Sequence, residues 1–255
     1  MLPPCPPQLR DRAAYIKAGD AKMSDNFTLD GRLTLCAHYV RQGSRLADVG
    51  TDHAYLPVWL ALNGRIRSAV ACDIRQGPLD NARANIARCG VEGIVSAVLS
   101  DGLDAISPDL AEDIVIAGMG GELIAKIIQK PQWLRDGSRR LILQPMTRAE
   151  TLRLFLCENG FCIDEEKACT SGKKYYSVML CHYDGIIREC TDLFAYAGRL
   201  TDDTSHEAHC YLAIVRNKLA KKLLSYRDDM TGYEKLSAVI TAIDSLISRP
   251  EGTKT

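Results

Sequence analysis

The chain has 255 residues, and its 32 Lys and Arg side chains are balanced by 32 Asp and Glu, so the formal net charge is zero. With 46% hydrophobic and 25% charged residues, the composition excludes wholesale disorder, collagen-like repeats and a polybasic tail. No apolar run approaches the roughly 20 residues that a membrane-spanning helix needs, so we expect no membrane partner. Any nucleic-acid surface would require a local concentration of positive charge.

The N-terminal segment, residues 1–27, is rich in proline and polar residues and has no apolar period. This composition predicts a flexible extension. Because the segment has neither a charged start nor a long apolar core, we do not expect a secretory signal. The sequence leaves open whether Met1 or Met23 is the true start.

The ten cysteines include no Cys-x-x-Cys pair. The closest spacings join Cys157, Cys162 and Cys169, and no histidine stands at zinc-ligand spacing from them. We therefore predict reduced, packed thiols in a cytoplasmic protein and no metal site.

From Leu29 onwards the hydrophobic pattern is regular. Apolar residues at helical spacing over 29–40 predict a leading amphipathic helix. Short apolar runs that alternate with helical segments predict strands at 46–49, 68–73, 94–99, 113–117 and 140–144. Helices are expected from near Pro57, over 76–89, after 117 and over 149–158. Such continuously apolar strands between helices are typical of a mostly parallel sheet covered on both faces.

The C-terminal third has a different pattern. Segments 161–168 and 175–181 predict an antiparallel hairpin, unlike the all-parallel dinucleotide-binding fold. Beyond a boundary near Gly185, Thr204–Glu207 and Thr231–Glu234 are capping boxes that predict the starts of two helices. Both helices carry apolar stripes, which predicts an antiparallel helical hairpin.

The segment Asp48–His53 follows the first predicted strand, where ligands bind in such sheets. Gly50 allows either a tight turn or the close approach of a ligand. Asp52 stands where a dinucleotide fingerprint would have its second glycine, and a carboxylate there disfavours a diphosphate such as NAD or FAD. Asp52 as a helix N-cap is the alternative, but Pro57 prefers the first helical turn and would leave Asp52 outside capping range.

Acidic residues also follow the next two predicted strands. Asp73 can accept hydrogen bonds from ribose hydroxyls, and Asp101-Gly102 sits where an adenine amino group can be recognised. Each alone is equally well explained as a turn. Together with Asp52 they favour a nucleoside without phosphate, such as S-adenosylmethionine. The glycine-rich segment Ala117–Gly121 indicates a closely approached backbone or positive φ angles.

Three segments together carry a resemblance: Asp48–Pro57, Ile116–Gly121 and Leu141–Pro145. They resemble the bacterial tRNA (adenine-22-N1)-methyltransferase family (TrmK), over residues 29–185. The resemblance implies a Rossmann-like class I methyltransferase sheet, mostly parallel with an antiparallel terminal hairpin. It also implies S-adenosyl-L-methionine as cofactor and methyl transfer to N1 of an adenosine in tRNA. The expected domains are then 1–27, 28–185 and 186–255, the last a coiled-coil-like helical hairpin.

The motifs and the resemblance indicate a set of site residues. Those expected to bind the cofactor are Asp48, Gly50, His53, Asp73, Ile74, Asp101, Gly102, Ala117 and Gly118. Asp52 is the expected catalytic residue, beside the target base. Some relatives have Glu at the position of Asp73, and some have Asn at the position of Met146, so no catalytic role is assigned to residue 146.

Basic residues provide the candidate tRNA contacts. They are Lys173, Lys174 and Tyr175 in the predicted hairpin turn, and Arg216, Lys218, Lys221 and Lys222 on the first C-terminal helix. Residues 204–227 carry five positive charges and one negative charge, a net +4, which indicates either phosphate contacts or a solvated face. We expect no DNA partner and no obligate protein partner. A methyltransferase of small molecules or proteins, and a catalytically silent RNA-binding module, are the alternative functions.

Overall fold

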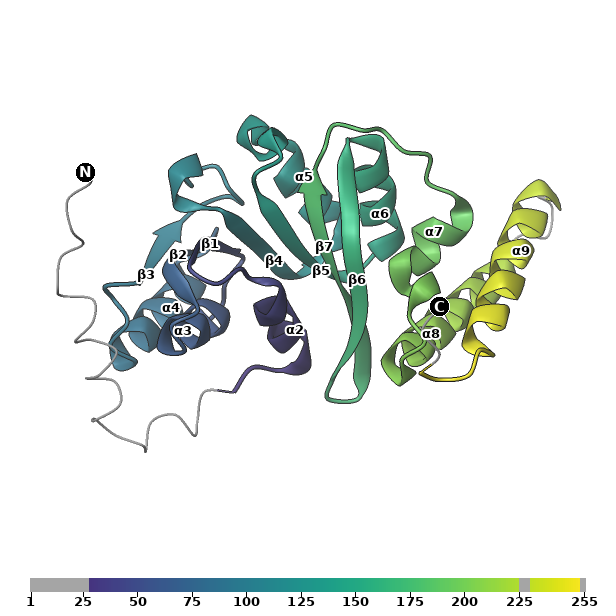
Figure 1. Cartoon of the computed structure of the whole chain (residues 1–255), viewed down its shortest axis with the longest axis horizontal. Coiled ribbons are helices and arrows are strands. Elements are labelled where there is room, and N and C mark those ends of the chain that lie inside the picture. The colour runs from purple at the N-terminus through teal and green to yellow at the C-terminus, as the bar shows by residue number, and fades with distance from the viewer. Residues whose placement is uncertain (1–27, 225–229, 253–255) are drawn as a thin grey trace, which may run out of the picture.

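A computed structural model describes residues 28–224 and 230–252, which form a seven-stranded sheet with helices around it (Figure 1). The strands lie in the order β3-β2-β1-β4-β5-β7-β6. Their bounds are β1 (Ser44–Val49), β2 (Ile66–Asp73), β3 (Val95–Leu99), β4 (Asp113–Gly120), β5 (Arg140–Thr147), β6 (Phe161–Ser171) and β7 (Lys174–Tyr183). The predictions for 1–27, and the choice between Met1 and Met23, lie outside the described residues.

The sheet is mostly parallel, as predicted. β1 pairs in parallel with β2 and β4, while β2 pairs in parallel with β3 and β4 with β5. β7 runs antiparallel between β5 and β6. The expected Rossmann-like methyltransferase sheet with a terminal antiparallel hairpin is therefore confirmed.

Helices cover both faces of this sheet. Their bounds are α2 (Gly31–Tyr39), α3 (Tyr55–Leu62), α4 (Gln76–Arg88), α5 (Gly121–Gln129), α6 (Ala149–Glu158), α7 (Asp192–Ala197), α8 (His206–Leu223) and α9 (Met230–Ile247), with 3-10 turns η2 (Pro108–Leu110), η3 (Gln132–Asp136) and η4 (Gly198–Asp202). One apolar core lies under α5 and α6, and a second lies under α2, α3 and α4. Within the described ranges, no helix combines the length and apolar character needed to span a membrane.

The predicted helical hairpin is formed by α8 and α9, which lie beyond β6 at one end of the sheet (Figure 1). The backbone N–H of Gly252 donates to the carbonyl of Thr204 at 3.2 Å, so the end of α9 lies beside the start of α8 and the helices are antiparallel. Their shared core includes Leu212, Leu236 and Ile243. The short α7 and η4 join the same core and were not predicted, because an element of one or two turns has too little periodicity to detect.

Both predicted capping boxes are wrong in detail. The N-cap of α8 is Ser205, whose hydroxyl accepts from the Ala208 N–H at 3.2 Å, rather than Thr204. Thr231 lies inside α9, which extends from Met230. Adjacent Thr and Ser residues offer the same cap chemistry, so only the backbone geometry selects between them.

The glycine-rich segment has a positive φ at one position, as predicted, since the φ of Gly118 is 81°. The strand extends further than the predicted 113–117, because β4 continues through Gly120 and Gly121 is the first residue of α5. A Cβ at Gly121 would lie 2.2 Å from the carbonyl oxygen of Arg148. At this position the glycine therefore allows the start of α5 to pack closely against the start of α6.

A buried ion pair joins the sheet to the C-terminal helices. Arg153 of α6 and Glu166 of β6 form two contacts, Nη2–Oε1 at 2.7 Å and Nε–Oε2 at 3.2 Å, and both side chains are at most 1% exposed. Arg153 also donates to the carbonyls of Ala195 and Tyr196, at 2.7 and 3.0 Å. Glu166 accepts from the backbone N–H of Arg199 at 3.2 Å. The pair thus connects α6 and β6 with α7 and η4.

We expect Glu166→Gln to lower the free energy of unfolding by about 3–5 kcal/mol, because it leaves a buried guanidinium without its counter-ion. Urea denaturation at pH 7 measures the change. The matched control is Lys167→Gln, which removes the exposed pair with Glu165 and is expected to cost less than about 1 kcal/mol. Equal losses in the two variants would contradict the role of the buried pair.

Candidate active site

The predicted cofactor residues gather at one edge of the sheet. Asp48 and Gly50 lie at the end of β1, Asp73 ends β2, and Gly118 lies near the end of β4. β1 pairs with both β2 and β4 in parallel, so the carboxyl ends of the three strands are neighbours. Ligands bind at this edge in open α/β sheets.

The turn after β1 requires glycine at position 50. Gly50 has a φ of 77°, and an added Cβ would lie 1.9 Å from the Cε atom of Met119. The backbone N–H groups of Gly50 and Thr51 both donate to the carbonyl of Cys72, at 2.7 and 3.0 Å. These bonds hold the chain across the end of β2, and the positive φ of this turn favours glycine over any residue with a side chain.

Asp48 is a buried carboxyl group at the end of β1. It is 7% exposed, and burial raises its pKa to about 6, while a hydrogen bond with Thr51 acts in the opposite direction. Among the described residues, no ion pair neutralises it. Because an ionised carboxylate in such a place is unfavourable, a positively charged ligand at this edge would be stabilised by it.

Asp52 projects from the loop and does not cap a helix. Its side chain is 66% exposed and lies 3.3 Å from Nε2 of His53, whose ring stacks on Tyr55 with centroids 4.9 Å apart. The residue before α3 is Ala54, which has no side-chain cap, although its N–H donates to the Thr51 hydroxyl at 3.0 Å. The N-cap alternative for Asp52 is thereby excluded, and its carboxylate is available to a ligand.

Asp73 is held in place by the backbone that follows it. Its side chain is 9% exposed, and Oδ1 accepts from the Arg75 N–H at 2.8 Å and lies 3.4 Å from Arg75 Nε. The next residue, Ile74, is 61% exposed. A fixed carboxylate beside an exposed apolar side chain suits a ribose with an attached base.

Asp101 lies just after β3, where the structure adds an unpredicted partner. Lys130 Nζ lies 3.3 Å from Asp101 and 3.2 Å from Asp104, and these hydrogen bonds raise the pKa of Lys130. Gly102 has a φ of 59°. Sequence reasoning missed Lys130 because it lies at the end of α5, and only the tertiary fold brings it to this loop.

The ends of β4 and β5 carry a second unpredicted group. Gln144 is fully buried, and its Oε1 accepts from the Gly118 N–H at 3.0 Å. Arg32 of α2 reaches the same oxygen at 3.4 Å and the sulfur of Met146 at 3.3 Å, and its guanidinium lies over the ring of Tyr176. A glutamine in an apolar strand was the available signal for Gln144, whereas nothing in the sequence indicated Arg32.

The predicted tRNA contacts lie on two separate elements. Lys173 and Lys174 are exposed at the β6–β7 turn, on the same edge of the sheet as the cofactor residues. Tyr175 packs toward α8, with its ring 6.5 Å from that of His206. Arg216 is paired with Asp244 of α9 at 2.9 Å, so its charge is partly compensated.

The exposed basic residues of α8 are Lys218, Lys221 and Lys222. They lie in the second half of the helix. The last part of the predicted basic segment 204–227 lies outside the described residues.

Comparisons with known proteins agree with this geometry. Residues 29–179 match a family model described as a methyltransferase domain. The tRNA (adenine(22)-N(1))-methyltransferase of Bacillus subtilis (strain 168) is 36% identical over 165 residues, which cover 62% of this chain and 69% of that protein. A solved Streptococcus pneumoniae protein is 31% identical, with a TM-score of 0.76 over 86% of this chain and 100% of that one. The M. capricolum TrmK structure, in complex with S-adenosyl-homocysteine, is 26% identical, with a TM-score of 0.71 over 86% of this chain and 97% of that one.

The sheet order, the acidic edge and the matched domain define a methyltransferase of the Rossmann-like class. The similarity extends to the C-terminal helices, since the solved relatives cover more of the chain than the domain itself. The chain belongs to the tRNA (adenine(22)-N(1))-methyltransferase family.

We expect Asp48→Asn to raise the free energy of unfolding at pH 7 by up to about 3 kcal/mol. The folded-state pKa of about 6 exceeds the ordinary value of 3.8, so the folded protein holds a proton more tightly than the unfolded chain. Asp48 therefore carries no penalty below about pH 4, and stability is lost as the pH rises through about 6.

Urea denaturation at a series of pH values from 4 to 8 measures this effect. The Asn variant should lack the decline that the unmodified protein shows between about pH 4 and 7. The exposed Glu92 gives the control Glu92→Gln, expected to follow the unmodified profile within about 0.5 kcal/mol. Identical profiles for all three proteins would show that Asp48 is not buried in this way.

Proposed function

We propose that the chain transfers a methyl group from S-adenosyl-L-methionine to N1 of an adenosine in tRNA, at position 22. The observation that carries the proposal is the acidic edge of the sheet, with Asp48 buried and lacking an ion-pair partner among the described residues. The position in tRNA and the substrate are supported by the activity named for the B. subtilis relative. The cofactor is supported by the S-adenosyl-L-methionine held in a second S. pneumoniae structure.

The residues at the edge fit this cofactor. Asp48 suits its positive charge, Asp73 its ribose hydroxyls, and Ile74 the face of its adenine. Asp101 is the candidate acceptor of a hydrogen bond from the adenine amino group. Its carboxylate then either serves both Lys130 and the adenine or gives up its contact with Lys130. When bound, the cofactor supplies a methyl group on a positively charged sulfur.

The remaining members of the predicted cofactor set belong to the same edge. They are Gly50, His53, Gly102, Ala117 and Gly118. The positive φ angles at positions 50, 102 and 118 let the backbone approach a ligand without a side chain between them.

The chemistry demands little acid–base catalysis. N1 of adenine has an in-plane lone pair and no proton at neutral pH, so it attacks the methyl carbon directly. The new N–C bond forms as the C–S bond breaks, and the electron pair of that bond stays on sulfur. The enzyme must align the nitrogen, carbon and sulfur and accommodate the positive charge that moves onto the base.

Asp52 is the residue we assign to that charge. Its carboxylate is exposed next to the cofactor residues, where it can accept a hydrogen bond from the adenine amino group. A negative charge at this point stabilises the cationic product and the transition state before it. His53, 3.3 Å from Asp52, orients the carboxylate.

The tRNA surface is proposed to run from the β6–β7 turn to α8. Lys173 and Lys174 lie on the same edge as Asp52, and Lys218 and Lys221 are exposed on α8. A target base that is paired or stacked in folded tRNA has to be extruded to reach such a site. A cytoplasmic location, with no DNA or obligate protein partner, belongs to the same proposal.

Asp52→Ala is expected to lower kcat for methyl transfer by about 10²–10³-fold, because it removes the group that offsets the developing charge. Affinity for S-adenosyl-L-methionine should be nearly unchanged. The assay incubates labelled cofactor with bulk bacterial tRNA and identifies the modified nucleoside, while calorimetry measures cofactor binding.

The control for this assay is Asp80→Ala, which changes an exposed carboxylate on α4. Unchanged turnover in the Asp52 variant would refute its role. If the unmodified protein binds the cofactor without methylating tRNA, the proposed substrate is wrong. A small-molecule or protein acceptor, or a silent RNA-binding module, would then be favoured.

Lys218→Gln combined with Lys221→Gln is expected to weaken tRNA binding and to reduce the slope of log K against log salt by roughly 2, because two phosphate contacts are lost. Filter binding at several salt concentrations measures the slope. Arg83→Gln, on the exposed face of α4, is the control. An unchanged slope in the double variant would place the RNA contacts elsewhere.

A further inference from the structure

The strands β6 and β7 bring together three side chains with metal-binding chemistry. Cys162 of β6 is paired directly with His182 of β7. The register shifts between Ile163 and Glu165, so Asp164 is the extra residue of a β-bulge. Bulges re-aim side chains, and here the bulge places the Asp164 carboxylate beside His182.

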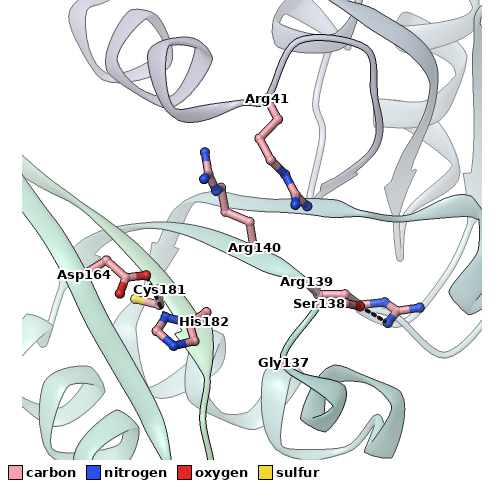
Figure 2. A pocket seen from close by; sticks show the side chains of 8 residues that line it. All are labelled: Arg41, Gly137, Ser138, Arg139, Arg140, Asp164, Cys181 and His182. Atoms are coloured by element: carbon pink, nitrogen blue, oxygen red, sulfur yellow. Dashed lines mark hydrogen bonds and ion pairs between the residues drawn. The ribbon is translucent and has the colours of Figure 1, made fainter.

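The ligand atoms of the three residues are close enough to share one ion. One Sγ, one imidazole nitrogen and one carboxylate oxygen all lie within 4.8 Å of one another. His182 Nδ1 lies 2.8 Å from Asp164 Oδ2, as the dashed line in Figure 2 marks. Cys162 is half-buried, and the side chains of Asp164 and His182 are 40% and 37% exposed, so an ion has a path from solvent.

We propose that Cys162, Asp164 and His182 bind one divalent transition-metal ion, with Zn²⁺ as the best match. A thiolate, an imidazole and a carboxylate are the three ligand types that Zn²⁺ uses in proteins. Three protein ligands leave a fourth tetrahedral position for water. Sulfur and nitrogen ligands disfavour Mg²⁺ and Ca²⁺, which take oxygen ligands.

Three arginines around the site have carboxylate partners, and a fourth donates to a backbone carbonyl. Asp164 and His182 line a pocket of about 220 Å³ whose other walls include Arg41, Arg139 and Arg140 (Figure 2). Arg41 is paired with Asp113, Arg139 with Asp136, and Arg140 donates to the carbonyl of Tyr39. Arg188, which is near Cys162, is paired with Asp184. Because these arginines have other partners, the Cys162 thiolate and the Asp164 carboxylate are available to offset the two positive charges of an ion. The pocket gives water access to the bound ion.

The site lies at the opposite edge of the sheet from the cofactor residues. β7 runs antiparallel to β5, with Cys181 beside Leu141, so His182 lies at the amino end of β5. β6 is the last strand of the sheet, and a bound ion would clamp it to β7 at the bulge. The ion would thus stabilise the pairing of β6 with β7, independently of methyl transfer.

Spacing along the chain predicted no metal site. Cys162 and His182 are 20 residues apart in the sequence, and the hairpin register alone makes them neighbours. The proposal departs from the prediction of packed thiols at one cysteine, Cys162, to which it gives a metal-binding role. The described cysteines are all free thiols, as the structure shows.

The test uses the full chain, stripped of metal and titrated with ZnCl₂ by calorimetry and with CoCl₂ by absorption. We expect one ion per chain and a sulfur-to-cobalt charge-transfer band. Cys162→Ser should abolish the band, and Asp164→Asn and His182→Gln should each weaken Zn²⁺ binding by more than about 10-fold, since even outer-shell changes cost that much. Cys89→Ser, at the end of α4, is the matched thiol control.

Thermal denaturation with and without Zn²⁺ provides a second readout. Zn²⁺ should raise the Tm of the unmodified protein and of Cys89→Ser, because binding favours the folded state, but not the Tm of Cys162→Ser. Circular dichroism of the metal-free proteins checks that the variants fold. No binding by the folded protein, or a charge-transfer band that survives Cys162→Ser, would overturn the proposal. Methyl transfer by Cys162→Ser should be unchanged, and a loss comparable to that of Asp52→Ala would overturn the separation of the two sites.

Discussion

The arrangement of this molecule depends on the buried pair between Arg153 and Glu166. Removing two charges from water is costly, and their attraction offsets that cost only when further hydrogen bonds satisfy both groups. Here those bonds come from the backbone of residues 195–199. Burial alone would lower the pKa of Arg153, but Glu166 holds it above its usual value. The chain after the sheet is therefore required to pass over this pair, which determines where the C-terminal helices begin.

That placement connects the proposed RNA surface to the proposed catalytic edge. Glu166 lies on β6, and the β6–β7 turn extends beyond the carboxyl ends of the parallel strands, where Tyr175 meets the start of α8. Beside the turn of the same hairpin, the Ser171 hydroxyl donates to Asp30 at 3.1 Å, and Asp30 is in turn paired with Arg32. The neutral net charge of the chain thus conceals an acidic edge, where we propose that the cofactor binds, and lysines on neighbouring elements.

The two edges of the sheet have different chemistry for a topological reason. Parallel strands place the polar residues that follow them at one edge, which here holds Asp48, Asp52 and Asp73. The antiparallel β7 returns the chain to the other edge, where Cys162, Asp164 and His182 meet. A change at the second edge reaches the first only through the packed sheet between them, so the two sites can be tested separately.

The sequence by itself determined the class of fold, and it placed the candidate cofactor residues after successive strands of the sheet. Apolar runs between helical segments required a covered parallel sheet, and Asp48–His53 had to lie at the end of its first strand, because both properties depend on local periodicity and chain order. The tertiary structure alone decided the contacts of Arg32, Lys130 and Gln144, the partner of Arg216, and the meeting of Cys162 with His182. These depend on strand register and helix packing between residues distant in sequence, for which one chain carries no local signal. Even the helix caps, such as Ser205 in place of Thr204, were settled by backbone geometry, because neighbouring hydroxyl residues are chemically equivalent until the backbone selects one.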